Sequence, residues 1–256
     1  MKSKKINILY SLSSSSGIKK QNQDLAWVSF NKTGQLLAII CDGIGSETNS
    51  DLASKIVLET FSKSFMKKSH VFFPEWWFEK NLAIASNKLL HVYNTQKKQI
   101  GTTIVLCLVS KNTVHSFNIG DSRLYHFSFE YFKWSQMTKD HTLYNFLVEH
   151  NAPEISFIKH KNNLLSLTQF IDSSDLKREH IGYSYNKFQV NYNDIVFLAS
   201  DGLYNFIDLR TVVEQISING YKEFSSICDA LVKKAIYNRS NDNLSGIVIQ
   251  FGKNIR

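Results

Sequence analysis

Residues 36–45 read Leu-Leu-Ala-Ile-Ile-Cys-Asp-Gly-Ile-Gly, and this stretch decides how the rest of the chain is interpreted. Its first six residues are continuously apolar, which is typical of a strand buried on both faces. The strand ends directly at Asp42-Gly43, and Thr33-Gly34 before it is a turn signal. Residues 24–30 on the other side of that turn are therefore predicted to form a β-hairpin with it.

Other acidic residues stand at the ends of predicted strands. The apolar run 195–200 ends at Asp201, and the alternating run 114–119 is followed by Gly120-Asp121. Asp242 precedes the final strand, and Asp24 stands at the start of an early one. One Asp-Gly pair alone indicates a turn. Five acids at strand ends, four of them beside Gly or Asn, favour convergence on one rigid edge of the sheets.

An oxygen-rich edge of this kind suits Mg²⁺ or Mn²⁺, which prefer carboxylates, carbonyls and water. Glycine beside an aspartate lets the backbone approach an ion. Two ions about 3.5–4 Å apart would suit phosphoester hydrolysis, because they lower the pKa of a shared water and neutralise phosphate oxygens. A zinc site or disulfide framework is not predicted, since the cysteines are far apart and resemble buried thiols: Cys41, Cys107 and Cys228.

The rest of the chain predicts helices and further hairpins. Apolar residues at four-residue spacing indicate a helix over 50–61, and a longer apolar stripe indicates a helix from Pro74 to about residue 92. Strands are expected at 103–109, 114–119, 124–129 and 131–137, then helices at 209–216 and 223–237. Consecutive hairpins favour antiparallel sheets. Residues 141–180 indicate one short helix and a loop.

Composition narrows the class of protein. The chain has 256 residues and a formal net charge of +8, but no run of five or six like charges. Scattered basic residues suit phosphorylated substrates, and nucleic-acid or anionic-membrane contact is the alternative reading. No signal peptide and no membrane-spanning run is present, so we expect a soluble, cytoplasmic monomer with one domain, 1–256, and neither nucleic acid nor membrane as partner.

The ordered motifs resemble those of the metal-dependent Ser/Thr protein phosphatases of type 2C, the PPM family. That family carries Arg-x-x-Asn-Glu-Asp-like, Asp-Gly-Met-Gly-Gly, Gly-Thr-Thr, Gly-Asp-Ser-Arg, Thr-x-Asp-His-Ser, Ser-Asp-Gly-Leu and Asp-Asn segments in this order. Each motif is weak alone, and the ordered set is specific. The matching segments of this chain are Lys19–Asp24, Asp42–Ser46, Gly101–Thr103, Gly120–Arg123, Thr138–Thr142, Ser200–Leu203 and Asp242-Asn243.

The resemblance implies an α+β fold, a four-layer αββα sandwich of two packed antiparallel sheets flanked by helices. It also implies two Mn²⁺ or Mg²⁺ ions, with a third seen in bacterial members, and phosphoprotein substrates of a cognate Ser/Thr kinase. Asp42 would bridge both metals, Gly43 would lend a carbonyl, and Asp201 and Asp242 would complete the sites. Asp24 would lie close to one ion, and Asp121 would help hold the third together with Asp201.

Three departures from the family pattern bear on activity. Lys19 aligns with the phosphate-holding arginine and keeps the charge without the bidentate fork. Gln23 replaces a glutamate, and Ile44 stands where eukaryotic members have a histidine; the Ile form resembles the bacterial branch. The first two departures support an alternative function, a catalytically weak or inactive regulatory module of the same fold. We expect His141 and Arg123 to have structural roles, Arg123 by pairing with an acid.

Overall fold

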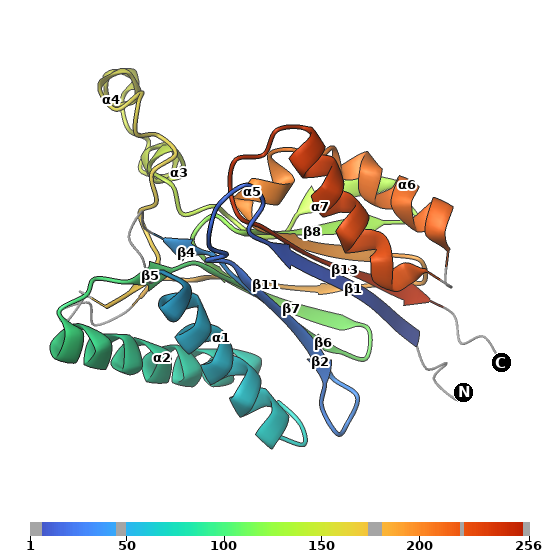
Figure 1. The fold of residues 1–256 in the computed structure, drawn as a ribbon. Coiled ribbons are helices and arrows are strands. Elements are labelled where there is room, and N and C mark those ends of the chain that lie inside the picture. The colour runs from blue at the N-terminus through green and yellow to red at the C-terminus, as the bar shows by residue number, and fades with distance from the viewer. Residues whose placement is uncertain (1–6, 45–49, 174–180, 221–222, 253–256) are drawn as a thin grey trace.

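The structure is a computed structural model that describes residues 7–44, 50–173, 181–220 and 223–252. Two five-stranded antiparallel sheets pack face to face, and helices cover their outer faces (Figure 1). This is the four-layer αββα sandwich that the family resemblance implied. The segment Gly45-Ser46 of the first glycine motif lies outside the described residues.

The first sheet contains the hairpin that opened the sequence argument. Its register pairs Leu25 with Cys41 and Phe30 with Leu36, which confirms the predicted turn at Thr33-Gly34. The hairpin predicted around residues 111–112 is confirmed in the same sheet. The strand order is β11 (Ser184–Gln189), β7 (Thr113–Ile119), β6 (Ile104–Ser110), β3 (Leu36–Cys41) and β2 (Leu25–Phe30).

The second sheet includes a strand that we did not predict from the sequence. Residues Asn7–Ser15 form β1 and pair with the last strand along their whole length. The serines at 13–15 form the end of that strand. The strand order is β1, β13 (Leu244–Gly252), β12 (Ile195–Ala199), β8 (Arg123–Ser128) and β9 (Lys133–Gln136).

Strand β3 is buried on both faces, as predicted. Leu37 and Ile39 pack under helices α1 (Ser50–Lys67) and α2 (Pro74–Gln96). Ala38 and Ile40 point the other way, into the core between the two sheets. A third core lies between the second sheet and its helices, which are α5 (Asp201–Tyr204), α6 (Leu209–Asn219), the 3₁₀ turn η1 (Phe224–Ser226) and α7 (Ile227–Tyr237).

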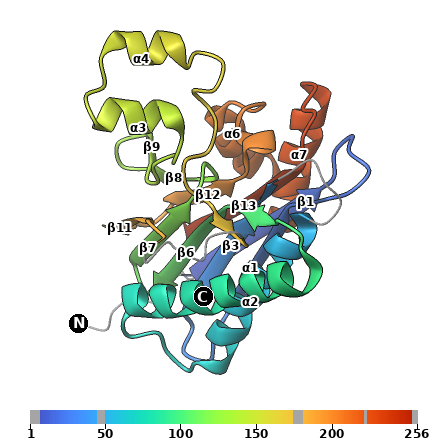
Figure 2. The ribbon, with the colours of Figure 1, turned by 90° about the vertical axis from the view of Figure 1, so that its left-hand side faces the viewer.

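Two short helices stand away from the sandwich (Figures 1 and 2). They are α3 (Leu143–Glu149) and α4 (Glu154–Lys159), so the prediction of a single short helix in this region was wrong. We call residues 143–167 the α3–α4 projection. Its return chain joins a small third sheet of β10 (Ile171–Asp172), β5 (Gly101–Thr102) and β4 (Gly43–Ile44), which lies beside the end of β3.

None of the helices in the described ranges combines the length and the apolar character that a bilayer span requires.

Candidate metal centre

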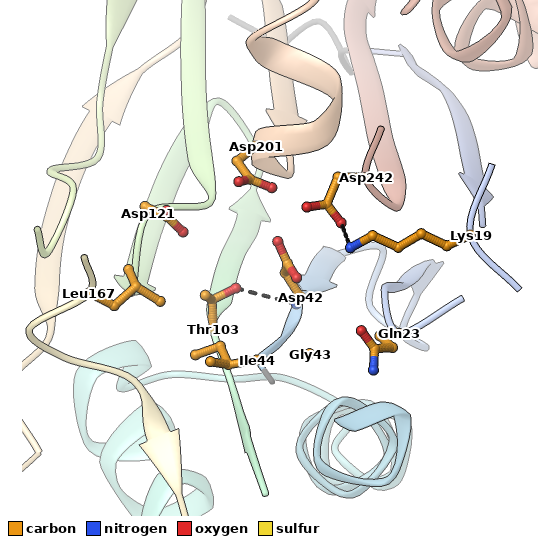
Figure 3. Close-up of a pocket in the computed structure, with 10 residues that line it drawn as sticks. All are labelled: Lys19, Gln23, Asp42, Gly43, Ile44, Thr103, Asp121, Leu167, Asp201 and Asp242. Carbon is orange, nitrogen blue, oxygen red and sulfur yellow. Dashed lines mark hydrogen bonds and ion pairs between the residues drawn. The ribbon is translucent and has the colours of Figure 1, made fainter. Parts of the chain in front are cut away.

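An open cavity of about 360 Å³ lies at one end of the sandwich and is walled by carboxylates (Figure 3). Four of the five aspartates that the sequence singled out line it together with Lys19: they are Asp42, Asp121, Asp201 and Asp242. They come from segments far apart in the chain, so the fold brings them together, as the strand-end argument predicted.

Asp42 is held in place by the backbone at the end of β3. Its amide donates to Thr103 Oγ1 over 3.2 Å, and its carbonyl accepts from the Thr103 amide over 2.9 Å. The hydroxyl of Thr102 donates to the same carbonyl over 2.9 Å. The Gly-Thr-Thr segment therefore fixes the position of Asp42, so the two threonines act as a scaffold for this aspartate.

Asp24 lies behind the cavity wall and is completely buried. Its Oδ2 accepts a hydrogen bond from Ser200 Oγ over 2.7 Å, and that hydroxyl in turn accepts from the Ser245 amide over 2.9 Å. Its Oδ1 is buried without a hydrogen-bond partner among the described residues. A buried carboxylate oxygen left unsatisfied is costly, which indicates a missing partner such as a cation or a water held by one.

Asp201 begins helix α5, and tight packing explains the glycine that follows it. A Cβ on Gly202 would stand 2.0 Å from the Asn243 carbonyl oxygen, so no larger residue fits there. Asn243 itself organises the loop that carries Lys19. Its Oδ1 accepts from the Gln23 amide over 3.0 Å, while its Nδ2 donates to carbonyls of that loop over 3.1 and 3.0 Å. The sequence marked Asp242-Asn243 only as a motif, and the structure assigns the asparagine this loop-holding role.

The residues around Asp121 behave as predicted. Arg123 forms a forked pair with Asp140, with nitrogen–oxygen distances of 2.6 to 3.0 Å, and stacks 4.0 Å above the ring of Tyr204. His141 accepts from the Gly120 amide over 3.1 Å and contacts Ser184 Oγ at 2.9 Å. Both side chains thus brace the loop that positions Asp121 rather than lining the cavity.

The carboxylates repel one another. Burial raises the pKa of Asp42 well above its usual value, and the neighbouring charges of Asp24 and Asp201 raise it further. Burial, followed by the charge of Asp201, raises the pKa of Asp121 to about 7. Burial, partly offset by Ser200, raises the pKa of Asp24 to about 6. Gathered acids with raised pKa values are typical of functional sites, and a bound cation would relieve this repulsion.

The donor set fits hard divalent cations. The described residues that line the cavity offer carboxylates and the Gly43 backbone, and none of them is a cysteine or a histidine. Within the described ranges, no three acidic, His or Cys side chains already stand at ligand distances around one point. Figure 3 shows that the Lys19 ammonium forms an ion pair with Asp242 Oδ1 at the rim. The two side chains are 39% and 41% exposed, so both can turn.

Three further lining residues shape the mouth of the cavity. Gln23 and Ile44, two of the three departures named above, both line it. Leu167, at the end of the α3–α4 projection, lines it as well and was not singled out from the sequence. Nothing in the local pattern marks Leu167, because only the return of the chain from the projection to β10 brings it to the cavity.

Known protein phosphatases are similar to this chain in sequence. The model of the family described as "Protein phosphatase 2C" matches residues 15–245. A candidate protein phosphatase of Mycoplasma pneumoniae is 35% identical over 249 residues, covering 93% of this chain and 94% of that protein.

Solved structures share the fold. The serine/threonine phosphatase of S. agalactiae superposes with a TM-score of 0.81 at 20% identity, covering 95% of this chain and 99% of that one. The catalytic domain of the serine/threonine phosphatase PstP, solved with two manganese ions, gives a TM-score of 0.76 at 18% identity, covering 97% and 99%.

Proposed function

Because the chain belongs to the protein phosphatase 2C family and is a protein phosphatase, we propose that it hydrolyses phosphoserine and phosphothreonine in proteins with two bound Mn²⁺ or Mg²⁺ ions. One observation carries this proposal: four aspartates from separate strand ends line a single open cavity. The manganese ions of PstP support the choice of metal. We propose further that the whole chain, 1–256, forms one phosphatase domain in the cytoplasm, supported by three buried free thiols.

The aspartates would divide the metal binding among them. Asp42 stands centrally and would serve both ions, with the carbonyl of Gly43 beside it. Asp201 and Asp242 would complete the two sites from the facing wall, and Asp121 with Asp201 would hold a third ion. The unsatisfied Oδ1 of Asp24 would accept from water held by one ion. When bound, the ions would lower the pKa of a water molecule and offset the charge of the phosphate.

Lys19 would bind the phosphate. Its stem is long and partly exposed, so the ammonium can leave Asp242 for a phosphate oxygen once a cation neutralises that carboxylate. A lysine contributes a point charge, so we expect weaker orientation of the phosphate than an arginine fork would give. Ile44 offers no proton, so we propose that the leaving oxygen takes its proton from water in the cavity.

The alternative, a regulatory module of the same fold without activity, is not favoured. Its support was Lys19 and Gln23, and Lys19 keeps its charge at the cavity rim. The aspartates of the site are all present, which such a module would not require. We propose that the substrates are proteins phosphorylated by a cognate Ser/Thr kinase, and that the enzyme acts as a monomer.

The test is hydrolysis of p-nitrophenyl phosphate and of a phosphothreonine peptide, with MnCl₂ and with EDTA. We expect metal-dependent turnover that the Asp42→Asn variant lacks and that the Asp229→Asn variant retains, since Asp229 lies exposed on α7. Absence of turnover in a folded, manganese-loaded protein would overturn the proposal and favour the binding module.

A further inference from the structure

The end of the sandwich opposite the metal centre exposes three large aromatic side chains, two on the connection between α1 and α2 and one in the first turn of α2. Phe72 is 75% exposed, Phe73 74% and Trp76 58%. Aromatic rings are normally buried, so three adjacent ones facing water indicate a surface with a partner. We call Phe72, Phe73 and Trp76 the aromatic patch.

The patch is held rigidly from below. Val71 and Trp77, its two chain neighbours, are buried in the core under α1 and α2. The Val71 amide donates to Gln35 Oε1 over 2.7 Å, and Gln35 Nε2 donates back to the Val71 carbonyl over 3.1 Å. Trp77 is thus buried in the core, whereas its neighbour Trp76 lies outside it. This exposure is imposed by the packed fold and does not arise from a loose loop.

Exposed lysines outnumber exposed acidic residues in the segments around the patch. Thr33 Oγ1 donates to the Ser69 carbonyl over 2.6 Å, which brings the turn between β2 and β3 against this connection. The Lys80 ammonium lies 5.0 Å from the ring of Trp76. Two exposed glutamates, Glu75 and Glu79, stand in the same stretch as Lys80. The exposed lysines on this connection, its flank and the adjacent turn are Lys32, Lys67, Lys68 and Lys80.

We propose that the aromatic patch binds the surface of an anionic lipid bilayer. Phenylalanine and tryptophan side chains enter the boundary between headgroups and acyl chains, while lysines nearby are attracted to anionic headgroups. The net charge of +8 adds a long-range attraction of the whole protein to the anionic headgroups. This inference replaces the sequence-based expectation that no membrane is a partner.

The geometry keeps the metal centre clear of such a surface. Strands β2 and β3 run between the two ends, with Asp24 and Asp42 at one end and the turn at Thr33-Gly34 at the other. Six residues of strand span roughly 20 Å. In Figure 1 the α1–α2 connection and the β2–β3 turn lie together at the bottom, away from β4 and the α3–α4 projection. The bound enzyme would hold its cavity toward the bulk solution.

The test is co-sedimentation of the full chain with vesicles. The lipids are phosphatidylglycerol mixed with phosphatidylcholine, or phosphatidylcholine alone. We expect at least tenfold stronger partitioning onto the anionic vesicles, weakened by 0.5 M NaCl, because salt screens the lysines. The triple variant Phe72→Ser, Phe73→Ser, Trp76→Ser should lose at least tenfold of the partitioning to anionic vesicles.

A matched control uses Tyr131→Ser with Phe132→Ser, which removes two rings that are 74% and 73% exposed on the turn after β8. This control should bind vesicles as the wild type does. Lys67→Glu with Lys68→Glu provides a second test that leaves the aromatic rings unchanged, and it should weaken binding at least fivefold. Equal binding of the wild type and the triple variant, or none by the wild type, would overturn the proposal. Self-association that the triple variant abolishes would assign the patch to a second copy instead.

Discussion

The metal centre and the α3–α4 projection are neighbours that are built in opposite ways. Asp42 is fixed by three hydrogen bonds to two threonines of adjoining strands, and Asp24 is wholly buried. In the projection only Leu147 is buried, and apolar side chains face water: Tyr144, Phe146, Val148, Ile155, Ile158 and Leu165. The difference separates two tasks. The rigid metal centre would carry the proposed chemistry, and the apolar, weakly supported projection beside it is suited to contact a protein substrate.

The largest effect on activity should come from a substitution in the metal centre. Asp201→Asn keeps the shape of the side chain but removes a charge that two metal sites would share. We expect turnover of p-nitrophenyl phosphate to fall by about 10³-fold or more, since the loss acts on transition-state charge. The same variant should be as stable as the wild type or more so in EDTA, because burial and Asp242 raise the pKa of Asp201. A thermal melt and steady-state kinetics measure both. If the variant lost activity because it unfolded, the result would contradict the view that Asp201 serves the chemistry rather than the stability of the metal centre.

A second prediction concerns His141, which lies between the metal centre and the α3–α4 projection. Burial lowers its pKa to about 4, against an ordinary value of 6.5. The unfolded chain therefore binds more protons between these values, so this group makes the fold less stable as the pH falls from 6.5 to 4. We expect the His141→Gln variant to lack this loss, which is on the order of 3 kcal/mol.

The measurement for His141 is urea unfolding of both proteins at pH 7 and pH 4.5. Asp24 and Asp121 act in the opposite direction, because their raised pKa values favour the protonated form in the fold. Only the difference between wild type and variant isolates the histidine. An equal pH dependence in the two proteins would show that the fold does not keep the His141 side chain neutral.

The third prediction addresses the projection itself. Replacing Tyr144 and Phe146 by serine removes exposed rings and should leave p-nitrophenyl phosphate hydrolysis unchanged. We expect kcat/KM for a phosphorylated protein to fall about tenfold, which is the size of one lost apolar anchor. The pair of substrates is the control. A fall of equal size for both would mean that the projection supports the metal centre rather than the substrate.

The smallest effect should come from Lys19. Lys19→Ala removes the phosphate contact and the ion pair with Asp242. We expect KM to rise about fivefold with little change in kcat, because exposed ion pairs contribute little. Lys19→Arg should lower KM below the wild-type value by restoring a fork. Initial-rate kinetics at saturating manganese distinguish these outcomes, and unchanged values in both variants would remove Lys19 from phosphate binding.

The sequence predicted the metal centre better than the α3–α4 projection, and the reason is physical. Continuous apolar runs such as 36–41 end where buried strands end, so the acids after them could be placed without knowing the topology. Strand β1 was missed because it ends in three consecutive serines and lies at the edge of its sheet, where pairing with β13 supplies most of the order. The projection was misread because its short helices bury almost nothing, which leaves no periodic stripe to detect.

The pairing of Lys19 with Asp242 was also beyond prediction from the sequence. These residues are 223 positions apart, and Asn243 brings them together by holding the loop of residues 16–23. Lys19 was recognised as a candidate only by alignment with a family arginine, and no local pattern announces an ion pair across such a separation. The sequence therefore identified the candidate residues of the metal centre, and the fold was needed to see which of them are in contact.

The most direct test of the central claim is calorimetric titration of MnCl₂ into the metal-free protein at pH 7, for the wild type and for Asp42→Asn. We predict that the wild type binds two ions and that the variant loses at least one of them while its circular dichroism spectrum is unchanged. Manganese should also raise the melting temperature of the wild type, since a ligand that binds only the folded state stabilises it. Equal manganese binding by both proteins, or none by the wild type, would contradict the assignment of this cavity as the metal centre.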